Sequence, residues 1–441
     1  MNTEVPVYDM AMVISALILI ATFIGLFMQR AHGIERAKYA MAGAGAIILA
    51  GQVMGFYSPQ LALEAMNWNI AFYLVLMMVI VSIIHSSGGF ETITTTLAKL
   101  SKGSQTKLII YLAAAVALCS LMLDNLTTII IFGPIIVIIC QNMGLSIIPY
   151  LICSTLAAHI GGLATLVGDP PNFMIGSAAE IHFNDFTLHM LPIALCCWVL
   201  LILGIRIAFK RELSRRVEHR FCDEKNFKNK SLWYRGLAIL AIIGVALSIH
   251  QSIGWQIWTV AAAGLTLLVF VLRHKELNKV HLQIETPLLL LLFSVFILIG
   301  GVEHSGLLNS LAQELESIVA YHPFIAALAV LWIAAVLSAL VDNIALSAAT
   351  IPILVTLEQH GIDVSLMWWS LVLGIGLGGN ATHIGSSANI YIVGLSERLA
   401  RENHSPHTVI TAKIWLQNAG PITFATLVLC SLFITLKYFY G

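Results

Sequence analysis

The chain has 441 residues, of which 59% are hydrophobic and 10% are charged, and its formal net charge is zero. Soluble domains carry roughly 25% charged residues, so the composition excludes a water-soluble globular protein. The zero net charge identifies no partner, and we expect none among the nucleic acids. Seven cysteines lie mostly inside apolar runs without CxxC spacing, which favours packing residues over a disulfide framework or a zinc site.

Apolar runs of about 20 residues recur along the chain, and each is long enough to cross the ~30 Å hydrocarbon core as a helix. The first series comprises spans near 11–29, 38–56 and 69–85, an amphipathic stretch near 90–103, a long run at 107–141, a Gly/Pro-interrupted segment at 146–180 and a span at 187–209. The second comprises spans near 232–250, 255–272 and 285–302, an amphipathic stretch near 305–319, a long run at 323–357, an interrupted segment at 365–397 and a span at 413–438. The run near 11–29 lacks a basic n-region and a cleavage site, so we expect it to be a retained span.

The two series also match residue by residue. Asp124-Asn125 recurs as Asp342-Asn343 at an offset of 218, and the segment 161–172 (GGLATLVGDPPN) recurs as 378–389 (GGNATHIGSSAN) at an offset of 217. We therefore predict a first repeat at 1–209, a linker at 210–231 and a second repeat at 232–441. Helix-breaking sequences at corresponding places in two halves are the best sequence indication of a transporter binding site.

Both long runs must break inside the membrane. A continuous helix over 107–141 would be ~52 Å long at 1.5 Å per residue, which exceeds the thickness of the membrane core. The polar pair Asp124-Asn125 at its centre predicts a re-entrant hairpin with this pair at its tip. The glycines and prolines of 161–172 predict a helix unwound in mid-membrane, where irregular backbone is tolerated only inside protein or along a cavity.

These elements predict an all-α polytopic membrane protein of two inverted repeats, each with five crossings, a re-entrant helical hairpin and a broken helix. An odd number of crossings turns the second repeat upside down. If residues 210–235, which include the linker 210–231, are cytoplasmic, the positive-inside rule leaves only Lys437 of the 23 Lys and Arg residues outside. Arg36 is counted among the cytoplasmic ones. We expect a bacterial inner-membrane protein with both termini outside and the two hairpin tips close together near the midplane.

Ionisable groups at membrane depth are costly and are by default functional. Asp124, Asp169 and Asp342 are such groups, with no Lys or Arg nearby in sequence, so they require a proton or a metal ion. We expect Asp124 and Asp342 as ligands of Na⁺, with Na⁺ or H⁺ as the coupling ion and no other cofactor. The further candidates for ion or substrate binding are neutral: Asn125, Thr127, Thr165, Gly168, Asn172, Asn343, Thr382, Ser386, Ser387 and Asn389.

Each signal also has a purely structural explanation. Asp124 or Asp342 would serve as an ordinary helix cap, and the Thr127 hydroxyl would bond back to the preceding turn. His159 and His383 flank the breaks, where polar packing is at least as good an explanation as proton transfer. The polar inventory does not fix the sign of the transported ion.

The strings Leu123–Thr128 (LDNLTT), 161–172, Val341–Asn343 (VDN) and 378–389 together resemble the ArsB/NhaD permease group of the ion transporter superfamily, and within it the pink-eyed-dilution members. The resemblance covers nearly the whole chain except the linker. It implies a scaffold and a transport domain, a homodimer, Na⁺ or H⁺ coupling and alternating access. It also implies that Asn125, Thr165, Asn172, Asn343, Thr382 and Asn389 lie at the site. NhaD-type antiporters resemble GDTTT where this chain has GDPPN, and ArsB-type exporters lack both Asp-Asn pairs, so neither substrate transfers.

Three membrane-depth carboxylates without basic partners would make a strongly negative site, which favours cation exchange. We therefore predict an ion-coupled secondary active transporter, with sodium/proton antiport ranked first. The alternative is a proton- or sodium-coupled anion carrier, such as arsenite efflux or carboxylate transport. The expected partners are thus a small inorganic ion or small anion, together with membrane lipid. An intramembrane aspartyl protease is disfavoured because the Asp-Asn element is duplicated. The sequence does not exclude a passive channel.

Overall fold

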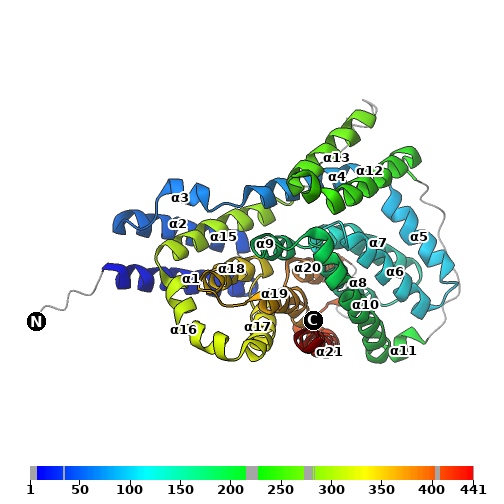
Figure 1. The fold of residues 1–441 in the computed structure, drawn as a ribbon. Helices are drawn as coiled ribbons and strands as arrows, with labels where there is room; N and C mark the ends of the chain where they lie inside the picture. Colours follow the sequence, from blue (N-terminus) through cyan, green and yellow to red (C-terminus); the bar gives the residue numbers. More distant parts are fainter. Residues whose placement is uncertain are drawn as a thin grey trace, which may run out of the picture.

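The computed structural model describes residues 7–32, 35–214, 227–272, 282, 284–402 and 408–440, which form helices and connecting turns without any β-strand (Figure 1). The first half consists of α1 (Val7–His32), α2 (Arg36–Met54), α3 (Pro59–Glu64), α4 (Trp68–His85), α5 (Gly89–Leu100), α6 (Gln105–Ser120), α7 (Asn125–Asn142), α8 (Ile148–Leu163), α9 (Pro170–Ala178), α10 (Phe183–Ala208) and α11 (Lys210–Leu213). The second half consists of α12 (Lys230–Ile249), η1 (Gln251–Ile253), α13 (Ile257–Val271), α15 (Thr286–His304), α16 (Leu307–Tyr321), α17 (Pro323–Ser338), α18 (Asn343–Gln359), α19 (Ser365–Gly378), η2 (Gly379–Ala381), α20 (Ser387–Glu402) and α21 (Ala412–Tyr440).

Length and surface composition identify a membrane protein. Within the described residues, eight helices are long and apolar enough to cross a bilayer. Large apolar side chains lie on the outer surface at helical spacing, and on α1 these are Met10, Val13, Leu17, Ile20 and Ile24, each more than half exposed. A face of this kind suits lipid and not water. The predicted polytopic class is confirmed.

The ten predicted crossings differ from these eight helices for a simple reason. α7 is one of the eight, although it is one arm of a hairpin. α13 has only 15 residues. The other two predicted crossings are the broken helices, which consist of the helix pairs α8–α9 and α19–α20. The orientation with both termini outside, and the homodimer, stay predictions.

The order of elements occurs twice, and so does their packing. α2 packs on α15 while α13 packs on α4, and α6 packs on α8 while α17 packs on α19. The hairpin arm α7 packs on α20, and α18 packs on α9. Each of these contacts recurs with the two halves exchanged, as two inverted repeats require. Figure 1 shows α7, α9, α18 and α20 in the middle of the molecule, so the repeats meet at their breaks.

Both long runs break where the polar pairs predict. α6 ends at Ser120 and α7 begins at Asn125, while α17 ends at Ser338 and α18 begins at Asn343. The predicted amphipathic stretches are α5 and α16. Of the predicted linker 210–231, residues 215–226 lie outside the described residues.

Glycines let each hairpin approach its broken helix. A Cβ on Gly161 would come within 3.0 Å of the backbone of Ala117, and a Cβ on Gly378 would do the same at Ala335. Because backbone cannot move aside as a side chain can, only glycine fits at these two helix crossings. The sequence therefore brings the hairpin tips against the unwound segments.

Candidate functional site

Each hairpin tip is fixed by one Asp and one Asn with matching roles. The Asp124 Oδ1 accepts a hydrogen bond from the Thr127 backbone N–H at 2.9 Å, and the Asp342 Oδ1 accepts one from the Ile344 N–H at 3.0 Å. Both aspartates therefore cap a half-helix. The capping explanation is correct for one carboxylate oxygen of each, and the second oxygen stays available for other partners.

The Asn of each pair turns back into its own hairpin. Ser120 donates its hydroxyl to the Asn125 Oδ1 at 2.9 Å, and Ser338 donates to the Asn343 Oδ1 at 2.7 Å.

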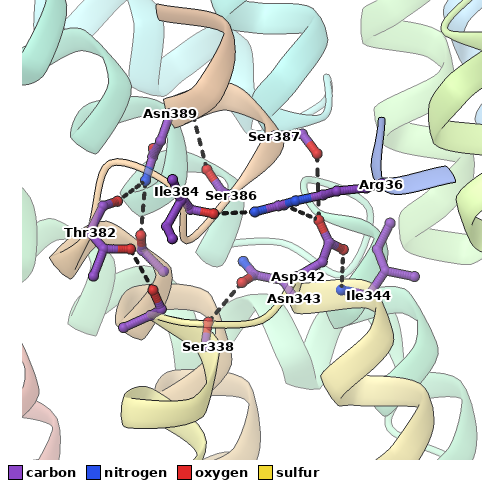
Figure 2. A network of polar contacts seen from close by, with 12 residues as sticks. Arg36, Ser338, Asp342, Asn343, Ile344, Thr382, Ile384, Ser386, Ser387 and Asn389 are labelled. Carbon is purple, nitrogen blue, oxygen red and sulfur yellow. Dashed lines mark hydrogen bonds and ion pairs between the residues drawn. The ribbon is translucent and has the colours of Figure 1, made fainter. Parts of the chain in front are cut away.

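The unwound segments are held by a second matched set of contacts. The Asn172 Nδ2 donates to the carbonyls of Gly162 and Thr165, both at 3.0 Å. The Asn389 Nδ2 donates to the equivalent carbonyls of Gly379 and Thr382, at 2.9 and 2.8 Å. Figure 2 shows this second set. Each Asn replaces the backbone donors that the broken helix has lost.

A threonine in each break then ties the unwound segment to the hairpin tip. The Thr165 hydroxyl donates to the Leu121 carbonyl at 2.6 Å, and the Thr382 hydroxyl donates to the Ala339 carbonyl (Figure 2). The sequence thus builds the same frame twice: a capped tip, an amide that closes the break and a threonine between the two.

One small cavity lies between the two frames. Its volume is about 40 Å³, enough for a few water molecules or one partly dehydrated ion. It is lined by Asp124, Asn125, Leu126, His159, Asp169, Pro170, Pro171, Leu288, Asp342, Asn343, Ile344, Ser386, Ser387 and Ala388. Helices α7, α9, α18 and α20 all begin at this cavity.

The predicted site residues fall into two groups. Seven line the cavity: Asp124, Asn125, Asp169, Asp342, Asn343, Ser386 and Ser387. The other six do not line it and belong to the surrounding hairpin tips and breaks: Thr127, Thr165, Gly168, Asn172, Thr382 and Asn389. Position 168 requires glycine because a Cβ there would meet the backbone of Gly162 and Ser120 within 3.0 Å. The ligand roles of all thirteen stay predictions.

Arg36 is the residue that the sequence analysis misplaced. Instead of facing the cytoplasm as a topology residue, it is only 6% exposed. Its Nη1 lies 2.8 Å from the Asp342 Oδ2, and its Nη2 donates to the Ile384 carbonyl in the second break. Figure 2 shows the guanidinium between the hairpin tip and the unwound segment. Asp342 therefore has a basic partner, contrary to the assumption that all three aspartates lack one.

A signal for this position exists in the sequence. The buried face of α2 comprises Arg36, Ala37, Ala40, Gly43, Ala44, Ile47 and Gly51. An arginine that begins a stripe of small residues at helical spacing points into the protein with them. Lys38, off this stripe, has a side chain 65% exposed.

Positive groups around the cavity offset part of its negative charge. Each helix N-terminus carries about half a positive charge, so four of them contribute about two, and Arg36 adds one more. These offset part of the charge of the three carboxylates. α9 begins with two prolines, which lack N–H donors, so direct donors come from the other three helices. Arg36 and the helix ends therefore reduce the negative charge that favoured cation exchange, while Asp124 and Asp169 have no Lys or Arg partner among the described residues.

The side of the cavity that the first repeat forms has two carboxylates, Asp124 and Asp169, whereas the side that the second repeat forms has one, Asp342. Asp169 corresponds to Ser386 at the 217-residue offset. Among the residues that the structure describes, no Lys or Arg pairs with Asp124 or Asp169. His159 also lies on this side. Its Nδ1 bonds the Thr155 carbonyl at 2.9 Å, while its buried Nε2 has no protein partner and is left for the cavity.

Comparison with known proteins identifies the family. The sequence model of the citrate transporter family (CitMHS) matches residues 16–374. The chain belongs to this family. Its members are secondary transporters, so the chain is a membrane transporter and not an enzyme. The finer assignment to the ArsB/NhaD group and its pink-eyed-dilution members stays a prediction.

Several relatives align with this chain along most of its length. An uncharacterised transporter of Mycobacterium tuberculosis is 28% identical over 440 residues, which cover 97% of this chain and 99% of the relative. The 46 kDa membrane protein of Mycobacterium leprae is 28% identical over 439 residues, with the same coverage. The magnetosome protein MamN of Magnetospirillum gryphiswaldense is 27% identical over 383 residues, 84% of this chain and 86% of the relative.

The fold also has a solved counterpart. The crystal structure of the Alcanivorax borkumensis YdaH transporter, described as having an unusual topology, superposes with a TM-score of 0.58 over 84% of this chain and 85% of that chain. The sequences are 15% identical, so the likeness concerns the fold alone. The helix arrangement of this chain therefore resembles that of a solved transporter.

Proposed function

We propose that this protein is a secondary active carrier that moves a small carboxylate anion together with a monovalent cation. The observation that carries the proposal is the meeting of four helix N-termini at one cavity. Helix N-termini attract anions through the helix dipole and through those N–H groups that no cap occupies. In transporters, broken helices aim such ends at substrate carboxylates. The description of the family as citrate transporters supports the same substrate class.

The coupling cation belongs to the acidic side of the cavity. Asp124 and Asp169 are both there, and neither has a Lys or Arg partner among the described residues. An anion would be repelled by these carboxylates unless Na⁺ or H⁺ neutralised them first. Binding of cation and anion is therefore mutually favourable, which is the thermodynamic basis of coupling.

The size of the cavity indicates that the carrier must open. A volume of about 40 Å³ is smaller than a tricarboxylate such as citrate. The hairpin tips must move apart to admit it, as expected for alternating access by movement of one group of helices against another.

Uptake into liposomes tests the proposal. Purified protein is reconstituted, and accumulation of radiolabelled citrate and of dicarboxylates is followed with an inward gradient of Na⁺, Li⁺ or H⁺. We expect uphill accumulation of a carboxylate with one of these gradients and none without it. Downhill flux alone would indicate a channel, and absence of carboxylate flux with uptake of arsenite would shift the substrate class.

Sodium/proton antiport is the second candidate, and one observation favours it. The cavity has the size of a partly dehydrated cation, and two carboxylates lie on its acidic side. Exchange of Na⁺ for H⁺ at this pair would need no further group. A Na⁺ pulse that alkalinises the lumen of carboxylate-free liposomes would support antiport, whereas the carrier that we propose gives no such signal until carboxylate is added.

A further inference from the structure

We infer that Arg36 is a built-in cation that occupies the place of a coupling ion in the second repeat, so that the carrier takes one free cation per cycle, at Asp124 and Asp169. The inference rests on the cation coupling proposed above. It assigns Arg36 a role in coupling stoichiometry, beyond the binding of substrate.

The two frames are equivalent enough for their contents to be compared. In each, a carboxylate caps the half-helix at the hairpin tip, and a threonine of the unwound segment donates to a carbonyl of the same tip. A carboxylate with backbone carbonyls and hydroxyls is the ligand set that a small hard cation prefers. In the second frame these oxygens are bonded by the guanidinium, at the Asp342 Oδ2 and the Ile384 carbonyl.

Arg36 is suited to a permanent role. Its guanidinium stays protonated at any physiological pH, and it is carried by α2, which packs along α15 through a face of small residues. Ser387 completes the group by donating to the Asp342 Oδ2 at 3.5 Å (Figure 2). A free cation could bind Asp342 only by displacing a buried, tethered charge.

Among the described residues, no Lys or Arg forms an ion pair with a carboxylate of the first frame. α13, the counterpart of α2, carries no Lys or Arg over Ile257–Val271. The carbonyl that corresponds to Ile384 belongs to Val167, and this frame has two carboxylates, Asp124 and Asp169, in place of one. The asymmetry leaves the first side as the place where a free cation balances the charge.

Removal of the side chain tests the inference, with Arg36→Ala beside the control Lys38→Ala, which alters an exposed basic residue two positions away. Carboxylate uptake is measured over a range of Na⁺ concentrations. Wild type and Lys38→Ala should show a Hill coefficient near one. Arg36→Ala should lose about tenfold or more in uptake at low Na⁺, because an order of magnitude corresponds to one lost charge-assisted contact. Millimolar guanidinium should restore the uptake. High Na⁺ should also restore it, with a Hill coefficient near two.

A binding measurement keeps the inference testable if no carboxylate is transported. Millimolar guanidinium should raise the melting temperature of purified Arg36→Ala by about 3 °C, as a ligand that fills the missing site would. It should leave wild type and the double variant Arg36→Ala/Asp342→Asn unchanged. An Arg36→Ala protein with wild-type Na⁺ dependence and no response to guanidinium would overturn the inference, while failure of carboxylate uptake with a retained guanidinium response would overturn the proposed substrate alone.

Discussion

The break of the first repeat and the break of the second share one polar frame but differ in charge. The amides Asn172 and Asn389 make the same pairs of bonds to broken-helix carbonyls. The carboxylate of Asp342 is neutralised by Arg36, whereas Asp124 faces a second carboxylate, Asp169. The comparison teaches that duplication preserved the polar scaffold of the site while its charges diverged. In the account proposed above, the first repeat binds the coupling cation, and in the second repeat Arg36 neutralises Asp342.

The largest expected effect breaks the symmetry of the two aspartates. Asp342→Asn leaves the buried Arg36 without its counter-charge, and loss of one partner of a buried ion pair costs about 3–5 kcal/mol. Asp124→Asn removes no such partner, and Asn caps a helix about as well as Asp, so its stability should lie within about 1 kcal/mol of wild type. Denaturation of the purified variants measures both. The double variant Arg36→Gln/Asp342→Asn should recover most of the loss, and equal losses in the two single variants would contradict the assigned asymmetry.

The next effect should be equal on the two sides. Asn172→Ala and Asn389→Ala each leave two carbonyls without their donor, and an unsatisfied buried group costs about 1–3 kcal/mol. We expect a loss of about 2–4 kcal/mol in each variant, seen as a lowered free energy of unfolding. Asn418→Ala, which removes a bond within α21 only, is the control. A loss confined to one repeat would show that the frames are not equivalent.

A smaller effect tests the close packing of hairpin on broken helix. Gly161→Ala and Gly378→Ala place a methyl group against backbone, and overpacking of this kind costs about 1–3 kcal/mol. Gly394→Ala, also helical, meets nothing within 4 Å and should be neutral or stabilising by up to about 1 kcal/mol. Thermal melts of the three proteins give the comparison. If Gly161→Ala melts like Gly394→Ala, the tight crossing is not needed.

The smallest perturbation tests the inversion itself. Single cysteines at surface positions change stability by about 0.5 kcal/mol or less, so labelling reports orientation without altering the fold. Cysteines at positions 60 and 184 should react from outside and one at 225 from the cytoplasm, with wild type as background. Positions 60 and 225 on the same side would contradict the inverted arrangement.

The sequence predicted the architecture of the site well because breaks in membrane helices leave clear traces. Prolines, glycines and polar pairs within apolar runs located both hairpins and both broken helices. Asp124 and Asp342 were found for the same reason, since charge is rare at membrane depth. Arg36 was missed because a basic residue at a helix end has two common fates, at the membrane surface or inside the protein. Only the contact of Arg36 with Asp342 at the tip of the second hairpin, 306 residues away in sequence, distinguishes them.

Cation-driven accumulation of carboxylate by Asp124→Asn tests the central claim most directly. Wild type and the variant are reconstituted at equal density and loaded with citrate, and both uphill uptake on a cation gradient and gradient-free citrate exchange are recorded. We predict that the variant loses uphill uptake at least tenfold, as expected when a charge-assisted contact to the coupling ion is lost, while its melting temperature stays near that of wild type. Undiminished uphill uptake in Asp124→Asn would contradict the account, because the coupling cation would then bind elsewhere.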